Sequence, residues 1–258
     1  MTSREMAIRA YLGDQIAQDK IGVGGSITNE LLDGILLLDI DFRTEADSLI
    51  RSMMKTVRQN VEMLVLQLRN DGYLFESKTP YTPPGPDVSK ELDHFEQTTK
   101  LFVPLIFRCW LEIVGEVTLM GTHPSWPKIT YNGLGGETGA AVVDPLYVVW
   151  TADFGLCSWN ELLKDIDNPY EHFRIEFAPD PGHKANYSSS GSYNLPATQH
   201  PSIDALVTDD DSPSSVPKIT FLQHIRLSFQ HAGFPGWQRY PDAPHESLQK
   251  LGNGLITF

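Results

Sequence analysis

The feature that most constrains the fold of this chain is a long amphipathic segment between residues 45 and 70. Charged or amide side chains such as Arg51 and Glu62 lie on one face, and Gly72 follows where a left-handed residue commonly ends a helix. The segment therefore predicts one long helix that packs a single face onto a core. Apolar residues recur at three- and four-residue steps along that face: Leu49, Ile50, Met53, Met54, Val57, Val61, Leu64, Val65 and Leu68.

The rest of the chain mixes helix and strand patterns without regular alternation. Helices are predicted over 88–101, from Pro104 to Gly115, from a capping box at Ser158 and Glu161, and over 219–232. Strands are predicted over 117–120, 146–150, 172–177, 202–208 and 255–258. This irregular order favours an α+β fold, with an antiparallel or mixed sheet, helices packed on it, and a helical N-terminal portion before it.

A proline-rich stretch, Thr79–Pro86, indicates a stiff connector and a candidate domain boundary. It divides the chain into a helical portion over 1–86, with a short helix around residues 8–16, and an α+β domain over 87–258. One compact unit is also compatible with the sequence, because 258 residues can form one large domain or two small ones.

Charge limits the classes of partner. The chain carries 20 basic and 33 acidic residues, a formal net charge of −13. Nucleic-acid binding and membrane-surface binding are not expected from such a balance, whereas a basic protein partner is compatible with it. The two cysteines, Cys109 and Cys157, imply no disulfide framework, and the apolar run over 34–39 is too short to span a bilayer. With no signal-peptide pattern at the start, we expect a cytoplasmic protein.

Sequence motifs of known chemistry are missing. There is no phosphate-binding loop, no nucleophile elbow and no paired histidine or cysteine motif for a metal, so no cofactor or metal is predicted. Ser247 and Lys250 have the spacing of the serine–lysine pair in penicillin-recognising enzymes, but the partner motifs of those enzymes are absent and the match is attributed to chance.

The strongest candidate site is a polar loop that follows the strand predicted over 172–177. Two prolines and a glycine indicate a turn there, and few apolar residues are available to pack it. Its candidate residues are Asp180, His183, Lys184, Asn186 and Tyr187. Recognition of a partner is the preferred interpretation, because no nucleophile or second acid accompanies Asp180, His183 and Lys184 at a recognisable distance.

Several segments together resemble the SUKH superfamily. They are Val103–Gly115, Asp144–Val149, Ser158–Leu163, Phe177–Asp180 and Phe221–Trp237, so the resemblance covers about residues 100–258 and rests on loose hydrophobic patterns. It implies a single α+β domain that binds proteins, as in fungal cell-wall-assembly regulators and bacterial immunity proteins that neutralise toxins. It offers no catalytic residues, and residues 1–100 have no counterpart in it.

Three functions remain open on the sequence. The first is a non-enzymatic protein-binding domain, for example an immunity protein whose partner is a basic toxin. The second is a hydrolase-like enzyme that uses a cluster of Asp180, His183 and Lys184, which would have to converge in a pocket. The third is a regulatory or structural scaffold, and an oligomer is compatible with it.

Overall fold

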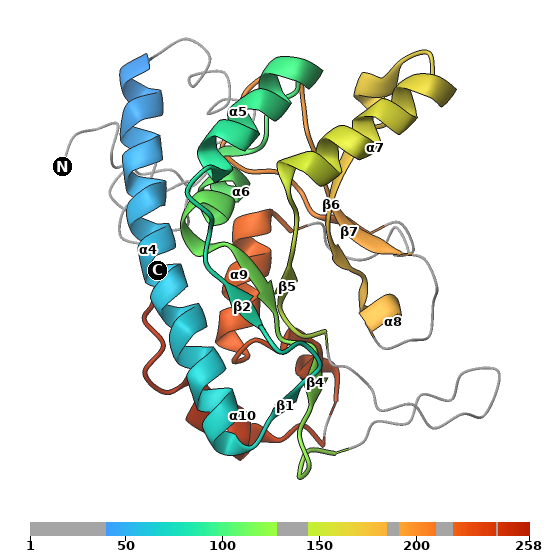
Figure 1. The fold of residues 1–258 in the computed structure, drawn as a ribbon. Coiled ribbons are helices and arrows are strands. Elements are labelled where there is room, and N and C mark those ends of the chain that lie inside the picture. Colours follow the sequence, from blue (N-terminus) through green and yellow to red (C-terminus); the bar gives the residue numbers. More distant parts are fainter. Residues whose placement is uncertain (1–39, 128–143, 185–190, 210–218, 241) are drawn as a thin grey trace, which may run out of the picture.

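The computed structural model describes residues 40–127, 144–184, 191–209, 219–240 and 242–258. The short helix expected around residues 8–16 lies outside these ranges, as do Asn186 and Tyr187. In the described part, helices α4 to α10 surround small antiparallel sheets, so the predicted α+β class is confirmed (Figure 1).

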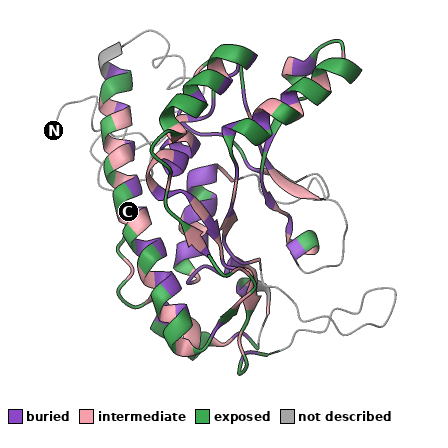
Figure 2. Ribbon diagram, in the orientation of Figure 1, coloured by how far each residue is buried: buried purple, intermediate pink, exposed green. Residues whose placement is uncertain are grey.

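The long N-terminal helix is present as α4, Ile40–Asp71. Its predicted apolar face is buried, including Ile50, Met54 and Leu68, each with no exposed surface. Figure 2 shows this buried stripe facing the rest of the molecule, with exposed residues on the opposite side of the helix. Gly72 has φ +94°, so the predicted left-handed end of the helix is confirmed.

Two helices follow: the second lies against α4, and the first lies against the π-helical turn that continues the second. They are α5, Val88–Thr99, and α6, Leu105–Cys109, which continues as the π-helical turn η1, Trp110–Val114. Pro104 is the N-cap residue of α6, one position before the predicted first turn. The predicted end at Gly115 is confirmed, because that residue has φ +94°.

Most strands are shorter than the sequence predicted, but the strand predicted over 172–177 is present as β6 at Arg174–Pro179. Two strands, β1 (Leu74–Phe75) and β4 (Gly121–Thr122), form one pair. A second sheet has the order β2 (Tyr81–Thr82), β3 (Glu116–Thr118), β5 (Tyr147–Val148). A third has the order β6 (Arg174–Pro179), β7 (Ser192–Pro196), β8 (Thr208–Asp209), and every pairing is antiparallel.

The proline-rich connector is part of the second sheet. Tyr81 and Thr82 pair with Val117 and Glu116, and Thr118 N donates to Pro80 O over 2.8 Å. The interpretation of this stretch as a spacer is therefore wrong for these residues. Buried side chains from both sides of residue 86 join one hydrophobic core.

The remaining helices differ from prediction mainly at their starts. Helix α7, Ala152–Asp165, begins six residues before Ser158, because Thr151 is its N-cap and accepts a hydrogen bond from Phe154 N. The predicted capping box at Ser158 is therefore wrong. Helix α7 is followed by the short 3-10 helix η2, Pro169–Glu171. The single turn α8, Pro181–Lys184, comes after β6.

At the C-terminal end, α9 spans Phe221–Gln230, inside the predicted range, and a capping box of Thr220 and Gln223 begins it. The 3-10 helix η3, Pro235–Arg239, and α10, His245–Gly252, follow. The strand predicted over 202–208 is wrong for most of its length, because only Thr208 belongs to a strand.

The last residues of the chain do not form the predicted edge strand. They are held by Asn60 of α4, whose amide donates to Ile256 O over 2.7 Å and accepts from Ile256 N over 2.8 Å. Arg226 Nε also donates to Phe258 O over 3.1 Å. The buried side-chain amide of Asn60 thus satisfies the backbone N–H and C=O groups of Ile256, as a neighbouring strand would.

We expect the substitution Asn60→Ala to lower the free energy of unfolding by about 2 kcal/mol, because it removes two hydrogen bonds from a buried amide. Urea denaturation measures this change, and faster hydrogen exchange at the Ile256 amide locates it. The matched control is Asn160→Ala, at an exposed position of α7. Equal stability of the two variants would contradict the assigned role of Asn60.

Candidate functional site

The structure separates the predicted trio of the polar loop. Asp180 is buried, and its Oδ1 accepts a hydrogen bond of 2.6 Å from His183 N, so this carboxylate organises the turn of α8. The His183 side chain is exposed, and its Nδ1 lies 3.3 Å from Gly191 O. Lys184 points inward and is 3% exposed. The three groups do not meet in one pocket, and of the three only His183 lies at the surface.

Lys184 belongs instead to a buried polar cluster that sequence reasoning missed. Its Nζ donates to Asp144 Oδ1 over 2.6 Å and to Pro145 O over 3.0 Å. The hydroxyl of Tyr193 donates to Asp144 Oδ2 over 2.9 Å, and Lys184 Nζ lies 5.0 Å from the centre of the Tyr193 ring. We call Asp144, Lys184, Tyr193 and the adjoining His224 the buried ion-pair cluster. It fastens α8 and β7 to the residues that precede β5.

In this cluster, the attraction between Asp144 and Lys184 offsets the cost of burying their charges. Burial works to raise the pKa of Asp144, but the charge of Lys184 and the hydrogen bonds from Lys184 and Tyr193 hold that pKa below its ordinary value. Burial lowers the pKa of His224 to about 4, against the attraction of Asp144. The imidazole is therefore neutral at pH 7, and its Nε2 has no hydrogen-bond partner among the described residues.

His224 makes the stability of the protein depend on pH. Its pKa falls from 6.5 in the unfolded chain to about 4 in the folded one, so the unfolded chain binds a proton that the native state excludes. The neutral histidine contributes fully above pH 6.5, and the contribution is lost as the pH falls toward 4. Through His224, the free energy of unfolding of the parent protein should fall by up to about 3 kcal/mol as the pH drops from 6.5 to 4. We expect His224→Phe to lack this fall.

Urea denaturation at a series of pH values tests this expectation. Asp144, Lys184 and Tyr193 face the ring and stay in both proteins, so the difference curve isolates the histidine. The matched control variant is His183→Gln, at an exposed position. Parallel curves for the parent protein and His224→Phe would be inconsistent with a neutral buried His224.

Ser247 and Lys250 have a structural explanation. Asp71, the last residue of α4, accepts a hydrogen bond of 2.8 Å from Ser247 Oγ. It also forms an ion pair with Lys250, whose Nζ lies 2.9 Å from Asp71 Oδ1. Trp126 Nε1 also donates to Ser247 Oγ over 3.1 Å. The hydrogen bond from Lys250 lowers the pKa of Asp71. These contacts hold α10 against α4. Among the described residues, no hydrogen bond joins Ser247 to Lys250.

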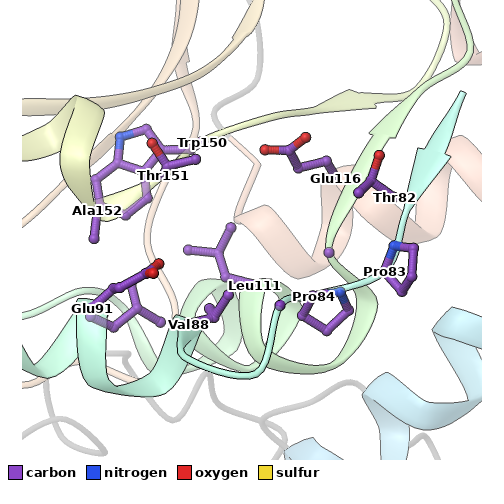
Figure 3. Close-up of a pocket in the computed structure, with 13 residues that line it drawn as sticks. Thr82, Pro83, Pro84, Val88, Glu91, Leu111, Glu116, Trp150, Thr151 and Ala152 are labelled. Atoms are coloured by element: carbon purple, nitrogen blue, oxygen red, sulfur yellow. The ribbon is translucent and has the colours of Figure 1, made fainter. Parts of the chain in front are cut away.

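A cavity of about 150 Å³ lies between the proline-rich connector, α5, η1, β3 and the start of α7 (Figure 3). We call it the connector cavity. Most of its walls are apolar, but two carboxylates, Glu91 and Glu116, reach it from opposite sides. Its lining is Thr82, Pro83, Pro84, Gly85, Val88, Glu91, Leu92, Leu111, Gly115, Glu116, Trp150, Thr151 and Ala152.

The local sequence explains the shape of this cavity. Gly115 has φ +94°, and a Cβ there would lie 2.8 Å from Pro84 N, so only glycine lets the connector approach the end of η1 this closely. Trp150 lies after β5 and immediately before the Thr151 cap, and its ring packs against Phe95 of α5 at a centroid distance of 5.4 Å. These two contacts fix opposite sides of the cavity.

The two carboxylates of the connector cavity differ from the acids around them. Neither Glu91 nor Glu116 makes an ion pair or a side-chain hydrogen bond within the part of the chain that the structure describes. Asp93, Glu96 and Glu112 nearby are all paired with Arg108. The cavity is thus apolar in its walls and negative at two points that no residue of the described chain neutralises.

Metal binding finds no support in the described residues, which contain no group of three or more histidine, cysteine, aspartate or glutamate side chains arranged to hold an ion. Within the same ranges, no helix is long and apolar enough to cross a membrane.

Comparisons with known proteins add no assignment. No protein-family model matches the chain, and neither the curated proteins nor the solved structures include a match to it. The resemblance of residues 100–258 to the SUKH superfamily therefore stays a prediction.

Proposed function

We propose that this protein is a non-enzymatic binding protein for a basic protein partner. The observation that carries this proposal is the connector cavity, a largely apolar hollow reached by two carboxylates, Glu91 and Glu116, that pair with no residue in the described ranges. A cavity of this kind offers apolar contact and a negative charge together, and concave apolar sites with a few placed polar groups are typical of binding.

The charge of the whole chain supports the same partner class. A formal net charge of −13 attracts a cationic protein over long distances and speeds its association at low salt. Catalysis has less support, because the hydrolase-like alternative needs Asp180, His183 and Lys184 in one pocket, and these groups point in different directions.

The resemblance to SUKH proteins suggests a specific role for such binding, that of an immunity protein whose partner is a basic toxin. Many toxins are neutralised by occlusion, which requires only a tight complex and no chemistry from the inhibitor. The acidic surface and the connector cavity are suited to that task.

The test is binding to the products of the genes that flank this one. Each product is purified and titrated into the full chain in a calorimeter at low and at high salt. A stable complex that weakens as salt rises, since salt screens charge attraction, supports the proposal. No complex with either flanking product at low salt, or a complex indifferent to salt, would count against a basic partner.

A further inference from the structure

From the walls and charges of the connector cavity we infer that it receives the side chain of a single arginine from the partner. This inference rests on the proposed binding function and specifies the chemistry of its contact. The cavity lies in the region where the connector, α5 and the start of α7 come together (Figure 3).

The size of the cavity selects one side chain rather than a small-molecule cofactor. Its volume is about 150 Å³. Pockets for drug-sized ligands are commonly about 300–1,000 Å³, so this hollow is too small for that class. Room for about five water molecules, at about 30 Å³ each, is comparable with one long side chain.

The walls suit the aliphatic part of such a side chain. Val88 and Leu111 line the inner part of the cavity in Figure 3, and Trp150 and Ala152 line the side formed by the start of α7. Long basic side chains bury their methylene groups along apolar surface and keep the charged end near polar groups. An acidic side chain would meet the like charges of Glu91 and Glu116 in this cavity.

The carboxylates favour arginine over lysine. Glu91 extends from α5 and Glu116 from β3, so the two approach the cavity from different elements. A guanidinium group is planar, carries several donors in a fixed fork, and can pair with two carboxylates at once. Trp150, which is 4% exposed, adds apolar contact at the side of the cavity that it lines.

The cavity is also prepared in advance for this charge. The acids paired with Arg108 cannot serve an incoming cation without breaking existing ion pairs, whereas Glu91 and Glu116 have no ion pair with a described residue to break. A contact that needs no rearrangement loses little free energy to reorganisation.

The experiment uses butylguanidinium as the probe and butylammonium as its matched competitor. Each is titrated into the isotope-labelled full chain, and amide shifts at Gly85, Gly115 and Ala152 report on the cavity. We expect saturable shifts with butylguanidinium at these amides, and binding weaker by about tenfold for butylammonium, which forms fewer hydrogen bonds.

Two variants locate the site. Glu116→Gln keeps the size of the side chain and removes its charge, and we expect it to weaken butylguanidinium binding by about tenfold. Glu161→Gln, at an exposed position of α7 that does not line the cavity, should change nothing. Thermal unfolding of both variants confirms that they remain folded.

The outcomes separate this inference from the proposed function. Absence of shifts at the cavity amides, equal binding of the two probes, or undiminished binding by Glu116→Gln would overturn the arginine assignment. If, in addition, the flanking gene product still binds the parent protein and Glu116→Gln alike, the binding function stands and only the cavity is excluded from it. If no flanking product binds but the probe does, the arginine site stands and the proposed partner is wrong.

Discussion

Replacement of Lys184 by methionine is expected to lower the free energy of unfolding by about 3–5 kcal/mol. The substitution keeps most of the apolar stem but removes the ammonium group that pairs with Asp144 Oδ1 at 2.6 Å. Asp144 then keeps its contact with Tyr193 and lies near His224 but has lost its cationic partner, and an unpaired buried charge is costly. Urea denaturation at pH 7 measures the loss.

Two further variants make this expectation specific to the buried pair. The double variant Lys184→Met with Asp144→Asn should regain part of the lost stability, because asparagine carries no charge and tolerates the left-handed backbone at φ +52°. Lys250→Met removes an ion pair of similar length whose lysine is 74% exposed, and should cost less than about 1 kcal/mol. Equal losses for Lys184→Met and Lys250→Met would show that burial adds nothing to the first pair.

The second large effect is expected at Arg108, whose guanidinium group connects α5 to η1. It pairs with Asp93 at 2.5 Å, Glu96 at 2.9 Å and Glu112 at 3.0 Å, and Glu112 also pairs with Arg51 of α4. Burial works to lower the pKa of Arg108, yet its hydrogen bond to Asp93 and the charges of its partners raise that pKa overall. Burial raises the pKa of Glu96, and the charge of Arg108 offsets only part of the rise.

Arg108→Met should therefore lower the free energy of unfolding by about 3 kcal/mol, since it leaves Glu96 and Glu112 close together without their shared cation. Lys90→Met is the matched control on α5, because the pair of Lys90 with Asp87 is exposed on both sides. If chemical denaturation shows the same small loss for both variants, the Arg108 network is not a stabilising element.

The helices that could be predicted from the sequence are those whose signal is local. The face of α4 repeats over many turns, and Gly72, Gly115 and Gly233 each adopt a positive φ where a helix was expected to end. Long periodicity and a glycine end depend on neighbouring residues alone, so no distant contact was needed to recognise them.

The errors arise where tertiary contacts override a local pattern. Ser158 and Glu161 have the spacing of a capping box, but Thr151 begins the helix earlier and turns Ser158 into an interior residue. Apolar residues over 202–208 indicated a strand, yet Asp204 is used there to accept backbone hydrogen bonds from Ala205 and from Leu222 in the first turn of α9. Apolar residues over 255–258 indicated an edge strand, yet Asn60 of α4 makes the backbone hydrogen bonds of Ile256 in place of a neighbouring strand.

The candidate sites illustrate a different limit. Lys184 was named as a candidate residue for binding a partner, but it is buried and pairs with Asp144, 40 positions away, and no sequence pattern joins the two. The connector cavity was missed for the same reason, since Glu91, Glu116 and Trp150 come from three separate elements. The sequence carried no signal for it, because the proline-rich stretch and Gly115 are distant along the chain and come together only in the fold.

The burial of Lys184 has a consequence for proteolysis. Trypsin cleaves after lysine only where the side chain can enter its specificity pocket, and a lysine that is 3% exposed and bound to Asp144 cannot do so in the native state. Cleavage after Lys184 therefore requires α8 to detach first. The rate of cleavage after Lys184, measured on a gel or by mass spectrometry, therefore reports how often α8 opens locally while the rest of the chain stays folded.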